Sequence, residues 1–170
     1  MKLITSDVRV SAICGIVEHR VGNALELAAV ALPVELRCSF DDLSYPVKPS
    51  DPTAYDTKRQ VILINGLAFC HRDADLNQFA IAHEIGHHVC DHLPSARTLR
   101  SSGVHSCVIA DWYAARWGFS EELRKERCLD RGEEYCANLP LLTNQDDFLA
   151  WVEEWLIQYR TAKLLGRSLP

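Results

Sequence analysis

The sequence has no apolar run long enough to cross a membrane and no secretory pattern at its start. A membrane helix needs about 18 or more consecutive apolar residues. The apolar stretch 27–32 is short and follows the acidic residues Glu18 and Glu26. These absences argue against a membrane protein and a secreted one. We therefore predict a cytoplasmic protein with no membrane partner.

The cysteines lack the pattern of a disulfide framework. The chain has seven of them, an odd number, and none belongs to a CxxC motif. Small secreted domains held by disulfides usually carry an even number at regular spacing. Free thiols in a reducing compartment are therefore the expected state.

The chain also lacks an excess of basic residues. Its 18 lysines and arginines are outnumbered by 23 aspartates and glutamates, which gives a net charge of −5. Broad binding to nucleic acid rests on basic surface, so no direct nucleic-acid partner is expected. The length of 170 residues, with 48% hydrophobic and 24% charged residues, is typical of one globular domain with a sizeable core.

The hydrophobic pattern predicts both helices and strands. Helices are expected at 10–32, from Asp73 or Asp75 to about 91, at 105–117, from 120 onward, and from 144 or 145 to 165. Strands are expected at 34–40 and 61–66, and loops at 41–60, with a short hairpin as the alternative there, and at 93–103. The last helix carries an aromatic stripe, which we interpret as core packing. Its members are Phe148, Trp151, Val152, Trp155, Leu156 and Tyr159.

One stretch carries the motif H-E-x-x-H, formed by His83, Glu84 and His87. Residues four apart lie on one face of a helix, so the two imidazoles can converge on one ion. Glu84 beside them can take a proton from a zinc-bound water. The surrounding helix is apolar, and Gly86 permits close packing of a neighbouring element. We predict that His83 and His87 bind Zn²⁺ and that Glu84 is the catalytic base.

The motif supplies two of the three protein ligands that a catalytic zinc site usually has. Asp111 is the first candidate for the third, because a buried carboxylate needs a cation beside it. Cys107 lies one turn earlier on the same face and is a softer ligand. If it bound together with Asp111, it would occupy the position of the water and inhibit the site. Glu134 is the alternative third ligand, and the sequence leaves the choice open.

Residues 61–65 and 78–87 resemble the ImmA/IrrE metallopeptidases, which are small zincins of bacteria and mobile elements. The resemblance is specific over 61–92 and extends over 105–119. It implies a small zincin-like α+β fold in which a short, mainly antiparallel sheet packs on the motif helix and the C-terminal half is helical. We expect one metallopeptidase domain over 1–170. Within it, residues 1–104 supply the sheet and the motif helix, and residues 105–170 complete the site.

The resemblance also implies roles for particular residues. His83 and His87 match the zinc ligands of the family, and Glu84 matches its general base. The family takes its third ligand from a Glu that is followed four residues later by Asp or Asn. In this chain Asp111 matches the later position, and Cys107 stands where the Glu would be.

The function that the resemblance implies is that of a zinc metalloendopeptidase. Members of the family cleave a partner helix-turn-helix repressor and so relieve repression. The short chain and the cysteine near the ligands resemble the stand-alone peptidases of CBASS phage-defence operons, in which a cysteine on the zinc is likened to a latency switch. Cys107 would then be an inhibitory ligand. A substrate peptide could add as a strand beside residues 61–65.

Two other functions fit some features of the sequence. In the first, the protein is a non-catalytic, zinc-containing module that docks a regulator through its Trp-rich last helix. In the second, it is a hydrolase of the deformylase type, which takes a cysteine ligand from a motif before the histidines. Cys70 is the nearest such residue and lacks that motif.

Overall fold

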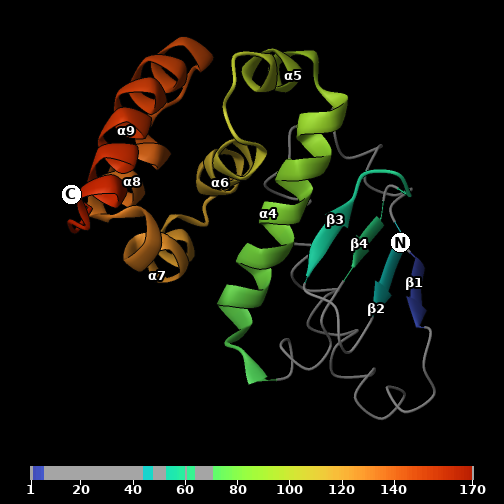
Figure 1. The fold of residues 1–170 in the computed structure, drawn as a ribbon. Coiled ribbons are helices and arrows are strands. Elements are labelled where there is room, and N and C mark those ends of the chain that lie inside the picture. The colour runs from blue at the N-terminus through green and yellow to red at the C-terminus, as the bar shows by residue number, and fades with distance from the viewer. Residues whose placement is uncertain (1, 6–43, 48–52, 60, 64–70, 170) are drawn as a thin grey trace.

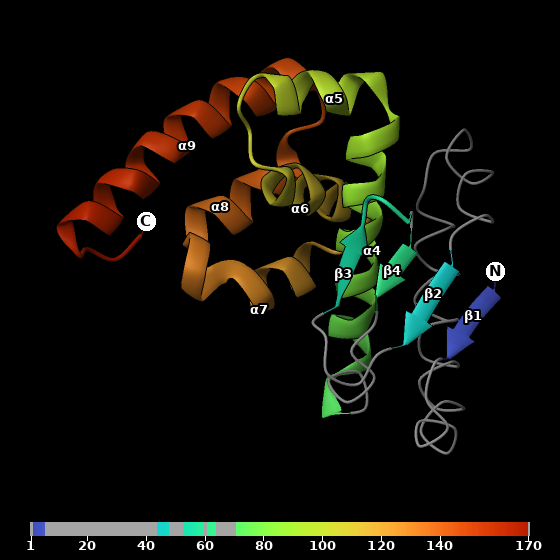
Figure 2. The ribbon, with the colours of Figure 1, turned by 45° about the vertical axis from the view of Figure 1, so that its right-hand side comes forward.

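The fold is built around a long central helix, with a small sheet on one side and further helices on the other (Figure 1). The computed structural model describes residues 2–5, 44–47, 53–59, 61–63 and 71–169. A view turned by 45° shows the same order of sheet, central helix and helical layer (Figure 2). The described residues therefore form an α+β structure, as the sequence predicts.

Among the described residues, the sheet has four short strands in the order β1-β2-β4-β3. They are β1 Lys2–Thr5, β2 Ser44–Val47, β3 Ala54–Asp56 and β4 Val61–Leu63. The pairs β1–β2 and β2–β4 are parallel, and only β3–β4 is antiparallel, which differs from the mainly antiparallel sheet expected. The strands of a parallel pair must be about a dozen or more residues apart in sequence, as β1 and β2 and also β2 and β4 are, whereas the short connection 57–60 allows an antiparallel return.

The predicted strands and loops of the first half are only partly met. Strand β4 begins where the strand 61–66 is expected and is described as far as Leu63. The segment 41–60, expected as a loop or a short hairpin, contributes β2 and β3, whose backbones pair with neighbouring strands. The expected helix 10–32 and strand 34–40 lie outside the described residues.

The central helix is α4, Ala74–His92, as the sequence predicts. It begins after Asp73 and has Asp75 in its first turn, where acidic side chains favour a helix start. Its buried residues lie on more than one face because the sheet covers one side and the helical layer the other. They include Phe79, Ile81, Ala82, Ile85 and Val89.

A short helix follows where the sequence suggests an exposed loop. Helix α5 spans Pro94–Ser101, within the polar segment 93–103, so the loop prediction is wrong. Pro94 occupies the start of the helix, where its missing N–H costs nothing. Ala96 and Leu99, three residues apart, are fully buried. Two apolar residues are enough to form the buried face of a short helix. In a segment of mostly polar residues, two such positions do not produce a recognisable helical pattern.

The remaining helices form the layer on the far side of α4. They are α6 Ser106–Arg116, α7 Ser120–Arg131, α8 Glu133–Asn138, the 3₁₀ turn η2 Leu139–Leu141 and α9 Gln145–Leu165. The starts of α6, α7 and α9 agree with the sequence prediction. Within the described part of the chain, no helix has the length and hydropathy that a membrane span requires.

The aromatic stripe of α9 packs into the core. Phe148 and Trp155 are almost completely buried, and Phe148 stacks on Trp112 of α6 with ring centroids 4.2 Å apart. Trp155 packs against Tyr135 of α8 at 4.7 Å. The interpretation of this stripe as core packing is therefore confirmed, and its buried rings are not free to dock a regulator.

Candidate metal centre

Helices α4 and α6 pack at very close range beside the motif. A methyl group on Gly86 would lie 2.7 Å from the Cα atom and 2.9 Å from the carbonyl oxygen of Ala110. Only glycine therefore fits at this point of α4. Ala110 stands between Cys107 and Asp111 on α6, so the close contact brings both of these side chains next to His83. The packing role expected for Gly86 is confirmed.

The two motif histidines converge as predicted. Their Nε2 atoms lie 3.1 Å apart, and the ring planes are nearly perpendicular. Two nitrogens bound to one tetrahedral zinc ion lie about 3.3 Å apart, given bonds of about 2.0–2.1 Å. The observed separation is therefore close to the one that a shared ion would impose.

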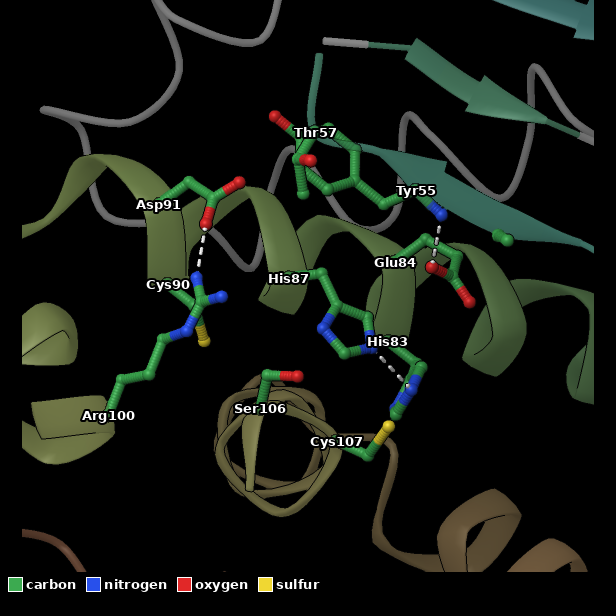
Figure 3. A pocket seen from close by; sticks show the side chains of 11 residues that line it. Tyr55, Thr57, His83, Glu84, His87, Cys90, Asp91, Arg100, Ser106 and Cys107 are labelled. Atoms are coloured by element: carbon green, nitrogen blue, oxygen red, sulfur yellow. Dashed lines mark hydrogen bonds and ion pairs between the residues drawn. The ribbon is translucent and has the colours of Figure 1, made fainter. Parts of the chain in front are cut away.

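The sulfur of Cys107 completes a group of three donors. One ligand atom from each of His83, His87 and Cys107 lies within 4.8 Å of the other two. Figure 3 shows the thiol of Cys107, at the start of α6, pointing toward His83. Two imidazole nitrogens and a thiolate form a donor set that suits Zn²⁺. These three residues could hold a metal ion.

Asp111 contacts His83 on the side of the ring away from the other donors. Its Oδ1 atom lies 2.7 Å from Nδ1 of His83, on an approach that departs from the ideal hydrogen-bond direction. The carboxylate is completely buried. A carboxylate on Nδ1 orients an imidazole and leaves Nε2 free to bind a metal. The arrangement therefore favours Asp111 as a partner of a ligand, in place of the direct ligand expected from the sequence.

Asp111 also accepts hydrogen bonds from two residues that the sequence analysis does not identify. The hydroxyl of Tyr135, on α8, donates to Oδ2 of Asp111 at 2.7 Å. The Nε–H of Arg127, on α7, donates to Oδ1 at 3.4 Å. The only sequence signal for Tyr135 is its place next to Glu134, the alternative third ligand. Glu134 is half-buried on α8, and among the described residues it does not belong to the donor group.

The pKa values of the two histidines diverge. Burial lowers the pKa of His83, but the carboxylate of Asp111 and the thiol of Cys107 raise it to about 9. Burial and the neighbouring charge of His83 lower the pKa of His87 to about 4. Without a metal, His83 therefore carries an extra proton and a positive charge, while His87 is neutral. Metal ligands must be deprotonated, so a bound cation would replace this proton.

Asp111 keeps its charge although it is buried. Burial raises its pKa, but the close contact and charge of His83, together with Arg127 and Tyr135, hold the pKa below its ordinary value. A buried carboxylate is tolerated only when it is paired and hydrogen-bonded.

Glu84 lies between the motif helix and the edge of the sheet. Its side chain is buried, and burial raises its pKa. The backbone N–H of Tyr55, in β3, donates to Oε2 of Glu84 at 2.7 Å (Figure 3). The hydroxyl of Tyr55 also contacts Nδ1 of His88 at 3.0 Å. Tyr55 thus contacts two residues of α4, Glu84 and His88. Nothing in the sequence indicates this role.

A pocket of about 360 Å³ opens over these groups. It runs between β3, the face of α4 that carries Glu84 and His87, and the start of α6. Arg100 of α5 lies at its far end (Figure 3). His83, Glu84, His87 and Cys107 all line it. A ligand in this pocket could therefore contact both the metal-binding donors and the carboxylate of Glu84.

The chain was compared with known protein families, with curated proteins and with solved structures. No family model, curated protein or solved structure matches it.

Proposed function

We propose that the protein is a zinc-dependent endopeptidase. The observation that carries the proposal is the convergence of His83, His87 and Cys107 in a pocket that also holds the buried carboxylate of Glu84. His83 and His87 would bind the ion through Nε2 and Cys107 through Sγ. Zinc in such a site polarises the carbonyl group of a substrate. It also lowers the pKa of a water molecule bound to the ion from about 15.7 to about 7.

Glu84 is proposed as the general base. Its Oε2 atom accepts the N–H of Tyr55, while Oε1 has no hydrogen-bond partner among the described residues. Burial keeps the carboxylate away from bulk water and raises its affinity for a proton. It would accept a proton from the attacking water and deliver it to the leaving amine of the cleaved peptide.

The outer edge of β3 is the proposed platform for the substrate backbone. The sequence suggests that a peptide adds beside residues 61–65, but β4 is flanked by β2 and β3. Strand β3 ends the sheet within the described part of the chain, and Tyr55 places it on the pocket. A peptide beside β3 would lie along the pocket, over His83 and His87. Because the N–H of Tyr55 already binds Glu84, the main-chain contact of the peptide with this residue would be to its C=O.

We further propose that the substrate is a partner helix-turn-helix repressor, whose cleavage relieves repression. This step rests on the resemblance of residues 61–65 and 78–87 to the ImmA/IrrE peptidases. Cys107 is proposed as the third ligand in an active site, because Asp111 faces Nδ1 of His83. A fourth position then remains for water. A latent form with Cys107 as a blocking ligand would require Asp111 to bind the ion as well.

The test is cleavage of a repressor encoded next to the gene, incubated with the purified, zinc-loaded protein. A single cut is expected, and it should be lost in Glu84→Gln while zinc content is unchanged. Glu153→Gln, an exposed change of the same kind on α9, is the matched control and should cut normally. Cutting that persists in Glu84→Gln would refute the assignment of the base. Repressor binding without any cut by the wild type would favour a non-catalytic binding module.

A further inference from the structure

Three helices meet at the buried carboxylate of Asp111. His83 of α4 lies 2.7 Å from Oδ1, Arg127 of α7 donates to the same oxygen at 3.4 Å, and Tyr135 of α8 donates to Oδ2 at 2.7 Å. Asp111 and Tyr135 have no exposed surface. No water is needed to satisfy either oxygen of the carboxylate, because side chains already contact both.

The two carboxylate oxygens of Asp111 have different partners. A carboxylate can rotate about its bond to Cβ, and only some rotations aim an oxygen at Nδ1 of His83. The hydroxyl of Tyr135 fixes Oδ2, so Oδ1 is directed toward the imidazole. Arg127 supplies a positive charge beside Oδ1, which compensates the buried negative charge when His83 is a neutral metal ligand.

Tyr135 is itself held rigidly. Its ring packs against Trp155 of α9 at 4.7 Å, and the guanidinium of Arg131 lies 5.7 Å from the ring centroid. The orientation of the hydroxyl therefore depends on packing between α8 and α9. A residue held in this way can transmit a fixed geometry from the helical layer to the metal-binding face of α4.

We propose that Tyr135 and Arg127 are positioning residues for the metal centre, acting through Asp111 to hold His83 with Nε2 turned toward His87 and Cys107. The proposal rests on the proposed function only in that the three donors bind a metal, and it does not require peptide cleavage. Residues that orient metal-binding histidines typically contribute about 10- to 100-fold to metal affinity. Tyr135 acts one residue further out, so the lower end of that range is expected.

The experiment measures zinc affinity by competition with a chromogenic chelator, using the full-length chain. Tyr135→Phe removes only the hydroxyl and should weaken zinc binding about tenfold. The matched control is Tyr113→Phe, a similarly buried tyrosine on α6 whose hydroxyl does not contact Asp111. It should bind zinc with the affinity of the wild type. Equal affinity in Tyr135→Phe and Tyr113→Phe would overturn the proposal.

A second variant guards against a loss that comes from poor folding. Arg127 is partly exposed. Arg127→Met removes the guanidinium, which lies 5.7 Å from the centroid of the Phe79 ring, and keeps an apolar stem in its place. It too should weaken zinc binding. The absorption spectrum of bound Co²⁺ should change in both variants, because the angle of the His83 ring to the ion changes, and unfolding of the protein does not produce such a shift.

The outcomes separate this proposal from the endopeptidase. A wild type that binds no zinc overturns both. Zinc binding that is weakened in Tyr135→Phe, together with no cleavage by the wild type, supports the positioning role and refutes the peptidase. Unchanged Co²⁺ spectra in Tyr135→Phe and Arg127→Met refute the positioning role and leave the peptidase standing.

Discussion

Gly86 of α4 and Ala110 of α6 are in direct backbone contact, and a methyl at Gly86 would lie 2.7 Å from the Cα atom of Ala110. In an open helix, Gly→Ala gains about 1 kcal/mol of stability. We predict the opposite sign for Gly86→Ala, a loss of about 1–3 kcal/mol, because backbone atoms cannot move aside without separating the helices. Urea unfolding of the variant and the wild type measures this difference.

The same variant should weaken zinc binding, since Cys107 moves with α6 away from the motif histidines. Adding Ala110→Gly should not restore either property, because two of the three nearest atoms, Cα and the carbonyl oxygen, belong to the backbone. A Gly86→Ala protein as stable as the wild type would show that the two helices are not packed as described.

The central helix could be predicted from sequence because several local signals agree. Asp73 and Asp75 mark its start, apolar residues recur along it, and the motif places both histidines on one face. Helix α5 could not be predicted, because only Ala96 and Leu99 are buried in a polar segment. Its helical state depends on packing against neighbouring elements, which local composition does not record.

The third ligand could not be chosen from sequence for a geometric reason. Cys107 and Asp111 lie one turn apart on the same face of α6, so both were candidates. Which of them approaches Nε2 of His83 and which approaches Nδ1 depends on the position of α6 along the axis of α4. That position is set by the contact of Gly86 with Ala110. The contribution of Tyr135 depends on a contact between residues 24 positions apart, which no local pattern reveals.

Metal analysis should separate the roles of Cys107 and Asp111. Cys107→Ser removes a ligand atom and should leave little zinc on the purified protein. Asp111→Asn keeps an oxygen near Nδ1 of His83 and should retain zinc with an affinity about 10- to 100-fold weaker. Cys128→Ser, a partly buried free thiol on α7, is the control and should retain full zinc content.

The cleavage assay adds a second result for the same variants. If Cys107 is the third ligand, Cys107→Ser should lose activity together with its zinc. Increased cleavage by Cys107→Ser with zinc retained would instead identify the thiol as an inhibitory ligand, and would make Asp111 or another group the third ligand.

The backbone of Tyr55 should matter more to catalysis than its side chain. Its N–H donates to Glu84 and therefore does not pair with β4, so Tyr55→Pro removes the anchor of the base without removing a bond of the sheet. We predict that Tyr55→Pro lowers kcat about tenfold relative to Tyr55→Ala, a fraction of the roughly 10²–10⁴-fold that a positioned base contributes. Tyr55→Ala loses the same side chain but keeps the N–H.

Steady-state kinetics on a cleaved peptide provide the measurement for Tyr55. The two variants should have similar KM values, because both lose the contact of the hydroxyl with His88. Equal kcat values in Tyr55→Pro and Tyr55→Ala would show that the N–H does not position Glu84.

Zinc should stabilise the folded protein against heat, because the three donors come together only in the native state. His83 and His87 lie on α4 and Cys107 on α6, so an ion bound to all three holds the two helices together. At a free zinc concentration of about 100 times Kd, the gain is about 2.7 kcal/mol. For a chain of this length each kcal/mol raises Tm by about 2–4 °C, so a rise of about 5–10 °C is expected.

Thermal unfolding with zinc, with a chelator, and with zinc restored measures this gain and its reversibility. His87→Ala is the informative control, since it removes one donor at a partly exposed position and leaves the core intact. Its Tm should respond little to zinc. An equal rise in His87→Ala would place the bound ion elsewhere, for example at His88 and His92, whose ring centroids lie 4.3 Å apart on the same helix. His83, His87 and Cys107 would then not be the metal ligands, and the assignment of Glu84 as the catalytic base would also be wrong.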